Sequence, residues 1–95
     1  MAAYIHGNIE VTDAALYETY RREVPAVIAA HGGRYLVRGG AMTVLEGEAA
    51  PTRRVILEFP DMAHLMAFYT SPEYQRLIAI RQRASTGTLV AIEGV

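Results

Sequence analysis

The first strand predicted by the alternation of apolar and polar side chains covers residues 3–11. A period of two residues is typical of a strand that buries one face. The apolar set is Ile5, Gly7, Ile9 and Val11, and the other set is Tyr4, His6, Asn8 and Glu10. Because the second set is polar but not charged throughout, it favours a lined cavity or an interface over open solvent.

A helix is predicted next, with Thr12 or Asp13 as its N-terminal cap and Gly32-Gly33 at its end. A short side-chain oxygen caps the first free N–H groups, and glycine adopts the left-handed C-terminal conformation easily. Pro25 lies near the solvent side, so we expect it to bend the helix rather than end it. At 100° per residue, the arc that faces the core contains Leu16, Tyr17, Tyr20, Val24, Val27, Ile28 and His31.

Two strands are predicted in the middle of the chain. In the first, residues 34–38, alternation places Arg34, Leu36 and Arg38 on one face. Gly39-Gly40 breaks or bulges this strand; a continuation over residues 41–46 is left open, and a turn is expected at 47–51. In the second, residues 53–59, the opposing sets are Arg54, Ile56, Glu58 and Val55, Leu57, Phe59.

Two helices and a last strand are predicted in the C-terminal third. Pro60-Asp61 opens a short helix that carries Met62, Leu65, Met66 and Tyr69. Ser71-Pro72-Glu73 is typical of a helix start, because it combines a serine cap, an early proline and an acid in the first turn. The residues that share one face of this helix are Tyr74, Leu77, Ile78 and Arg81, and a strand over residues 88–93 follows Gly87.

This order of elements predicts one α+β domain over residues 1–95, with a ferredoxin-like antiparallel sheet and helices on one face only. The uncovered face would carry Tyr4, His6, Asn8, Arg38, Arg54, Ile56 and Glu58. This set of apolar, polar and charged side chains is too mixed for comfortable exposure to solvent. Pairing two such sheets in a symmetric homodimer would cover both faces.

Composition excludes several classes of function. The 95-residue chain has a net charge of −1, all nine basic residues are arginine, and cysteine is absent. This balance argues against a nucleic-acid or anionic-membrane surface, and the missing lysine and cysteine exclude Schiff-base, thiolate and disulfide chemistry. With neither a signal peptide nor an apolar run of membrane-spanning length, a cytoplasmic location is expected.

Several motifs together resemble a known family. They are Tyr17-x-x-Tyr20, HGGRYLVRGG over residues 31–40, Leu45-Glu-Gly47, Pro51-x-Arg53, Glu58-Phe-Pro60, Tyr69-x-Ser-Pro-Glu-Tyr74 and Arg81. The chain resembles the bacterial "domain of unknown function 1330", within the dimeric α/β-barrel superfamily. This resemblance implies a ferredoxin-like fold and a homodimer with a barrel between its subunits. It implies no activity, since the superfamily ranges from cofactor-free monooxygenases, lactone isomerases and haem-dependent chlorite dismutases to ligand-sensing domains.

The histidines offer one candidate for catalysis. His6 shares a strand face with Asn8, where it would act as a general base, hold a ligand, or remain an interface histidine bonded to a neighbour. His31 is expected to bond the last carbonyls of its helix, and His64 to lie at the surface. The three histidines have no metal-ligand spacing and no haem ligand stands out, so neither metal nor cofactor is expected.

The arginines are the other candidates. Arg38, Arg54 and Glu58 lie on faces that should converge, and Arg81 falls within an apolar helical face. Either the arginines pair with Glu46, Glu58 or Glu93 in a structural network, or one of them holds a substrate carboxylate. Truncating an arginine would separate these cases, by lost stability in the first and lost binding in the second. Tyr69 and Tyr74 are expected to rim a pocket.

Three functions are therefore carried forward. The first is a homodimer that binds a small organic carboxylate or aromatic molecule in a pocket between the open sheet face and its partner. The second is a cofactor-independent oxygenase or isomerase, with His6 as base and Arg38 or Arg54 orienting an oxyanion. The third is a dimerisation module without catalytic activity.

Overall fold

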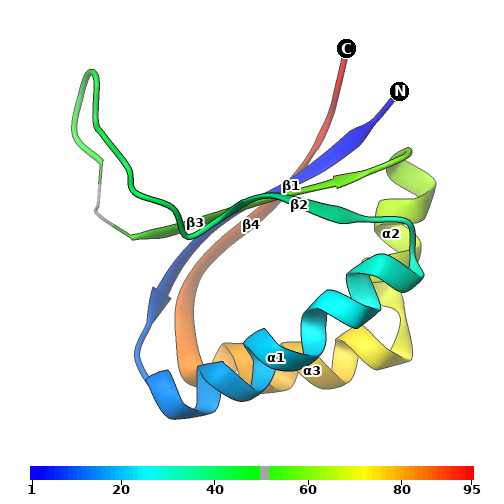
Figure 1. Cartoon of the computed structure of the whole chain (residues 1–95), viewed down its shortest axis with the longest axis horizontal. Helices are drawn as coiled ribbons and strands as arrows, with labels where there is room; N and C mark the ends of the chain where they lie inside the picture. Colours follow the sequence, from blue (N-terminus) through cyan, green and yellow to red (C-terminus); the bar gives the residue numbers. More distant parts are fainter. Residues whose placement is uncertain (50–51) are drawn as a thin grey trace.

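The computed structural model of the chain describes residues 1–49 and 52–95. Its elements are β1 (Ala3–Val11), α1 (Ala14–Ala30), β2 (Arg34–Arg38), β3 (Arg53–Phe59), α2 (Met62–Thr70), α3 (Pro72–Ala84) and β4 (Ser85–Glu93). The strands form one antiparallel sheet in the order β2-β3-β1-β4. The helices lie on one side of this sheet, as Figure 1 shows. The predicted ferredoxin-like α+β fold is confirmed.

The core fills the space between the sheet and the helices. On β1 the predicted apolar residues Ile5 and Ile9 are buried there, so the alternation assigned these side chains to the correct face. Phe68 of α2 lies at the centre of an aromatic cluster, with ring centroids 5.1 Å from Phe59 and 4.2 Å from Tyr74. These contacts pack α2 and α3 against β3, and so join the helices to the sheet.

Helix α1 begins and ends as its sequence predicts. The Asp13 side chain accepts a hydrogen bond from the Leu16 N–H at 3.1 Å. At the other end, the Gly32 and Gly33 N–H groups bond carbonyls one turn back, which satisfies acceptors that the last turn leaves free. His31 Nδ1 lies 2.9 Å from the Val27 carbonyl, which confirms its expected role at the helix end. Pro25 is accommodated inside the helix.

The sequence left open whether a strand continues over residues 41–46, between β2 and β3. Residues 41–46 form no strand; with the residues up to 49, they belong to a loop that projects beyond the sheet in Figure 1. Of the turn predicted at 47–51, Ala50 and Pro51 lie outside the described residues. The last strand begins at Ser85 rather than at residue 88, because its first residues pair with the end of β1.

Arg38 lies on the opposite face from the one that alternation predicted. Tyr35 pairs with Leu57 and Val37 pairs with Ile56, so β2 contains one residue more than β3 at this point. Such a β-bulge reverses the alternation beyond it. Val37 therefore joins the outer face and Arg38 turns toward the helices. The assignment of Arg38 to the open, dimer-facing side was wrong.

The outer face, which the helices leave uncovered, is arranged in rows across the strands. Its central row crosses all four strands through Val37, Ile56, His6 and Val90. One neighbouring row contains Arg34, Glu58, Tyr4 and Ile92, and the other contains Arg54, Asn8 and Thr88. Val90 and Ile92 keep 48% and 51% of their surface exposed. The outer face thus has an apolar centre between more polar margins.

Glu58 is held in place on the outer face by two neighbours. Arg34 Nε donates to its carboxylate at 2.7 Å, and this hydrogen bond, with a second from the Tyr4 hydroxyl, keeps the pKa of Glu58 below its usual value. The arginine that pairs with Glu58 is therefore Arg34. Because the pKa is lowered on folding, the pair stabilises the fold above the unfolded pKa and is lost as pH falls through the folded one.

We predict that Arg34→Gln raises the pKa of Glu58 toward its ordinary value, since the largest cause of the lowering is removed. An NMR pH titration of the Glu58 side-chain carboxyl carbon measures this change. Arg76→Gln is the matched control, because it breaks the Arg76–Glu23 pair of 3.0 Å on the helices instead. A Glu58 pKa that stays the same in Arg34→Gln would contradict the assignment.

Candidate functional site

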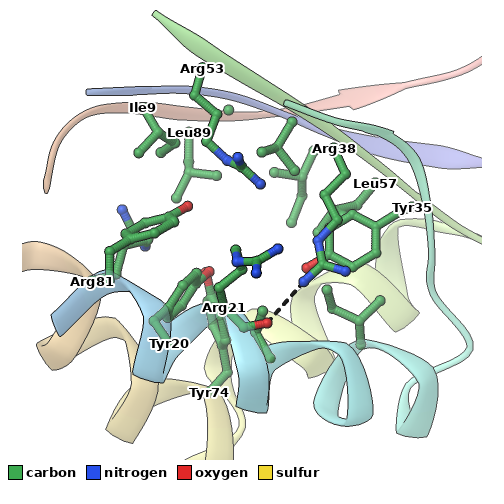
Figure 2. A pocket seen from close by; sticks show the side chains of 16 residues that line it. Ile9, Tyr20, Arg21, Tyr35, Arg38, Arg53, Leu57, Tyr74, Arg81 and Leu89 are labelled. Atoms are coloured by element: carbon green, nitrogen blue, oxygen red, sulfur yellow. Dashed lines mark hydrogen bonds between the residues drawn. The ribbon is translucent and has the colours of Figure 1, made fainter. Parts of the chain in front are cut away.

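A cavity lies between the helix-facing side of the sheet and helices α1 and α3, and Figure 2 shows the sixteen side chains around it. The centre of a water molecule can occupy about 30 Å³ of this cavity. The whole space between its walls that no protein atom fills, including the part that is open to solvent, is about 500 Å³. Its aliphatic walls come mainly from β1, β3 and α1. Its polar lining is Arg21, Arg38, Arg53, Arg81, Tyr17, Tyr20, Tyr35 and Tyr74. We call this space the arginine cavity.

Two of the arginines are held at its mouth. Arg38 donates from Nη2 to the Arg21 carbonyl at 2.9 Å, and its guanidinium lies 4.6 Å from the centre of the Tyr35 ring. The guanidinium of Arg21 is engaged by Glu18 through two hydrogen bonds, of 2.9 and 3.1 Å. Its charge is therefore balanced by Glu18, while Arg38 bonds only a neutral carbonyl here.

Arg53 and Arg81 lie deeper. Arg53 descends from β3, with its guanidinium carbon 5.9 Å from the centre of the Tyr17 ring. Arg81 projects from α3 and is only 9% exposed. In both, Nε is buried without a hydrogen-bond partner. Among the described residues that line the cavity there is no Asp or Glu, so the positive charge inside it is not balanced by its own walls.

Two tyrosine hydroxyls meet at the floor of the cavity. The hydroxyl oxygens of Tyr20 and Tyr74 lie 2.8 Å apart, and the positive charge of Arg81 acts to lower the pKa of Tyr74. Burial raises the pKa of both phenols above the ordinary value, which keeps them neutral. One of the two hydroxyl protons is used in the bond between the tyrosines, so the pair leaves one hydroxyl proton available for an acceptor in the cavity.

The predicted site residues are divided between the two faces of the sheet. Arg38, Tyr74 and Arg81 line the arginine cavity, whereas the strand register places four others on the outer face: His6, Asn8, Arg54 and Glu58. His6 and Arg38 therefore cannot act on one ligand within a single chain, which corrects the hypothesis that paired them as base and oxyanion holder. The alternative holder, Arg54, lies on the same face as His6, and that pairing stays a prediction.

The remaining candidates have local partners. Asn8 accepts a hydrogen bond from the Thr52 hydroxyl. Tyr69 packs 5.7 Å from the Tyr74 ring, and it lines an apolar groove of about 190 Å³ between α2 and β4 rather than the arginine cavity. Tyr69 and Tyr74 are thus neighbours that face different spaces.

Sequence reasoning missed Arg53, although its signal was present. Arg53 is in phase with Val55 and Leu57, so the same alternation that buries those two residues directs the arginine toward the helices. Arg21 was missed for a similar reason, since it lies one helical turn after Tyr17 on α1. In both cases the informative feature is a charged residue that falls at the same periodic positions as the buried apolar residues of its element.

Across residues 1–49 and 52–95, no three His, Asp or Glu side chains are grouped so that they could hold a metal ion. No helix in the described part of the chain is long and apolar enough to cross a membrane.

Comparison with solved structures identifies related folds. A protein of unknown function from Rhodopseudomonas palustris has a TM-score of 0.79 at 19% identity, over 99% of this chain and 82% of that one. SnoaB, a cofactor-independent oxygenase from Streptomyces nogalater, has a TM-score of 0.69 at 14% identity, with coverages of 99% and 93%. A dimeric ferredoxin-like protein of unknown function from Jannaschia sp. CCS1 has a TM-score of 0.67 at 16% identity, with coverages of 99% and 100%.

These identities establish the fold alone, and no curated protein sequence matches the chain significantly. The model of one family, in contrast, matches residues 2–95, which is nearly the whole chain. The resemblance carried by the glycine- and arginine-rich segment at residues 31–40 is thereby confirmed. The chain belongs to the family described as Domain of unknown function (DUF1330).

Proposed function

We propose that this protein binds a small organic carboxylate with an apolar body in the arginine cavity. The observation that carries the proposal is the set of arginines Arg38, Arg53 and Arg81 around a space whose described lining contains no acid. Charge taken out of water is costly unless a counter-ion accompanies it. A bound anion would supply that counter-ion and give the free Nε donors an acceptor.

The chemistry of the walls favours a carboxylate that carries a hydrocarbon group. The planar guanidinium donates through two parallel N–H groups, which fit the two oxygens of a carboxylate. Between the arginines the cavity is bounded by Ile9, Val24, Leu57 and tyrosine rings. Such walls solvate an aliphatic chain or a single aromatic ring better than they would a hydrated inorganic anion.

The size of the cavity limits the ligand. A water molecule needs a volume of roughly 10–15 Å³ that its centre can reach. The corresponding 30 Å³ of this cavity therefore holds two or three water-sized atoms before any side chain moves. A larger ligand enters only if Arg38, exposed at the mouth, breaks its hydrogen bond to the Arg21 carbonyl and turns outward. We therefore expect a ligand no larger than benzoate, bound with Arg38 turned outward.

A cofactor-independent oxygenase or isomerase is a second candidate. It is favoured by the neutral hydroxyl pair of Tyr20 and Tyr74 beside Arg81, which would donate a hydrogen bond to an enolate or phenolate oxygen as charge develops on it. The base would have to be a group other than His6, which lies on the outer face. Oxygen consumption in the presence of a bound carboxylate would distinguish an oxygenase from binding alone, and conversion of the ligand to an isomer without oxygen consumption would identify an isomerase.

We further propose that the protein is a homodimer paired through the outer face. The central row of this face places Ile56 between Val37 and His6, and Val90 at its edge is half exposed. Burying this apolar row against a second copy would remove it from water, and a twofold axis makes the face complementary to itself. In this arrangement each arginine cavity stays with its own chain, on the far side of the sheet.

We predict that benzoate raises the melting temperature and that benzamide, its neutral analogue, does not. At about ten times its Kd, a ligand specific to the folded state stabilises it by about 1.4 kcal/mol, which corresponds to several degrees. In Arg53→Met the benzoate shift is lost, while the melting temperature without ligand does not fall. Methionine keeps the apolar stem and removes a buried charge that has no counter-ion.

Arg83→Met is the control for this experiment, because Arg83 is an exposed arginine on α3 outside the lining of the cavity. It should keep the full benzoate shift. The proposal is wrong if benzoate and benzamide behave alike, or if Arg53→Met binds benzoate as well as the wild-type protein.

For the dimer, we predict a mass of about twice the 10.4 kDa chain by light scattering after size exclusion. Val90→Glu should give the mass of a single chain, since a carboxylate would be buried in the paired face. Met66→Glu on α2, at a residue 45% exposed against 48% for Val90, should remain dimeric. A wild-type protein of single-chain mass would overturn the pairing.

A further inference from the structure

Gly39, the residue after β2, lies directly against the guanidinium of Arg53. A Cβ atom built on Gly39 would be 2.5 Å from Arg53 Nη1 and 2.8 Å from Cζ, which is closer than real contacts allow. The Gly39 N–H donates to the Arg54 carbonyl at 2.8 Å, so the turn is fixed to β3 beside Arg53. The guanidinium occupies the space that any other residue at position 39 would fill.

The Tyr17 ring is a second neighbour of the same guanidinium, with its centre 5.9 Å from the central carbon. Arg53 therefore contacts the backbone of the turn and an aromatic ring, and its Nε is buried and unbonded. In Figure 2 it points into the space between sheet and helices. Both neighbours limit where this charge can be, and neither provides a hydrogen-bond acceptor for Nε.

We propose that Gly39 is a positioning residue for the anion site: its missing side chain lets Arg53 reach into the arginine cavity and fixes the direction of its N–H groups. This inference rests on the proposed function, since it assigns Arg53 to the ligand. It goes beyond that function by adding to the site a residue outside the lining of the cavity.

Backbone geometry by itself does not account for this role. Gly39 has a φ of 68°, in the left-handed region that favours glycine, and Gly47 has a φ of 77°. A Cβ on Gly47, however, would meet no atom within 4 Å. The two glycines thus share the requirement for a positive φ, and of the two only Gly39 has a guanidinium in its side-chain space. Gly47→Ala is therefore a matched control for Gly39→Ala.

The first test needs no ligand. The Arg53 Nε–H resonance, assigned by its loss in Arg53→Lys, should exchange slowly with solvent in the wild-type protein and in Gly47→Ala, because this atom is buried. In Gly39→Ala the added methyl group displaces the guanidinium, and the resonance should shift or exchange rapidly. An Arg53 Nε–H that is unprotected in the wild type, or unaffected by Gly39→Ala, overturns the proposal.

The second test measures the Kd of benzoate. Gly39→Ala should weaken binding about tenfold or more, because the paired N–H donors of the Arg53 guanidinium no longer align with the carboxylate. Gly47→Ala should change the Kd less than about twofold. In the Arg53→Lys background, Gly39→Ala should cause no further loss, because the two residues act through one interaction. An equal loss in both backgrounds would show that Gly39 acts only on the backbone.

A third variant covers the case in which Gly39→Ala does not fold. Asparagine tolerates a positive φ better than alanine does, yet its Cβ meets Arg53 in the same way, so Gly39→Asn replaces it in both tests with Gly47→Asn as control. If wild-type protein fails to bind benzoate, the proposed function fails. The resonance of Arg53 still decides whether Gly39 positions it.

Discussion

Unbalanced positive charge between the sheet and the helices is the constraint on which this account depends. Arg53 and Arg81 each bury an Nε without an acceptor, and Arg38 bonds only a backbone carbonyl. A fold that needed these residues only for stability would pair them with acids or replace them by apolar side chains. Arg34 and Arg76, outside the cavity, and Arg21 at its mouth do have carboxylate partners. The contrast supports a role for Arg38, Arg53 and Arg81 that is completed by a molecule from outside.

In the proposed function, the sheet separates ligand binding from association with a second copy. Its helix-facing side forms the core and the arginine cavity, while its outer face presents the apolar row through Ile56 and His6. Because side chains alternate along each strand, neighbouring residues serve different purposes: Arg53 reaches into the cavity, and Arg54 lies on the outer face. A substitution in one set is therefore expected to leave the other function in place, provided that the sheet itself is intact.

The fold was largely predictable from the sequence because the strands and helices are short and strongly periodic. The two faces of β1 and the ends of α1 follow from alternation and capping alone. The candidate site was less predictable. One extra residue in β2 reversed the direction of Arg38, and a β-bulge depends on pairing with β3, which a local pattern does not contain. Arg53 was predictable in principle, since its phase matched that of the buried residues of β3. The contact between Gly39 and Arg53 required the tertiary structure.

The central claim is that an organic carboxylate binds in the arginine cavity, with its charged group at Arg53. The most direct measurement is a crystal structure of the protein with benzoate, compared with one grown without it. The account predicts one benzoate per chain between the sheet and the helices, with its carboxylate within hydrogen-bond distance of Arg53. Benzoate on the outer face beside His6, or an empty cavity while benzoate occupies other sites, would contradict it.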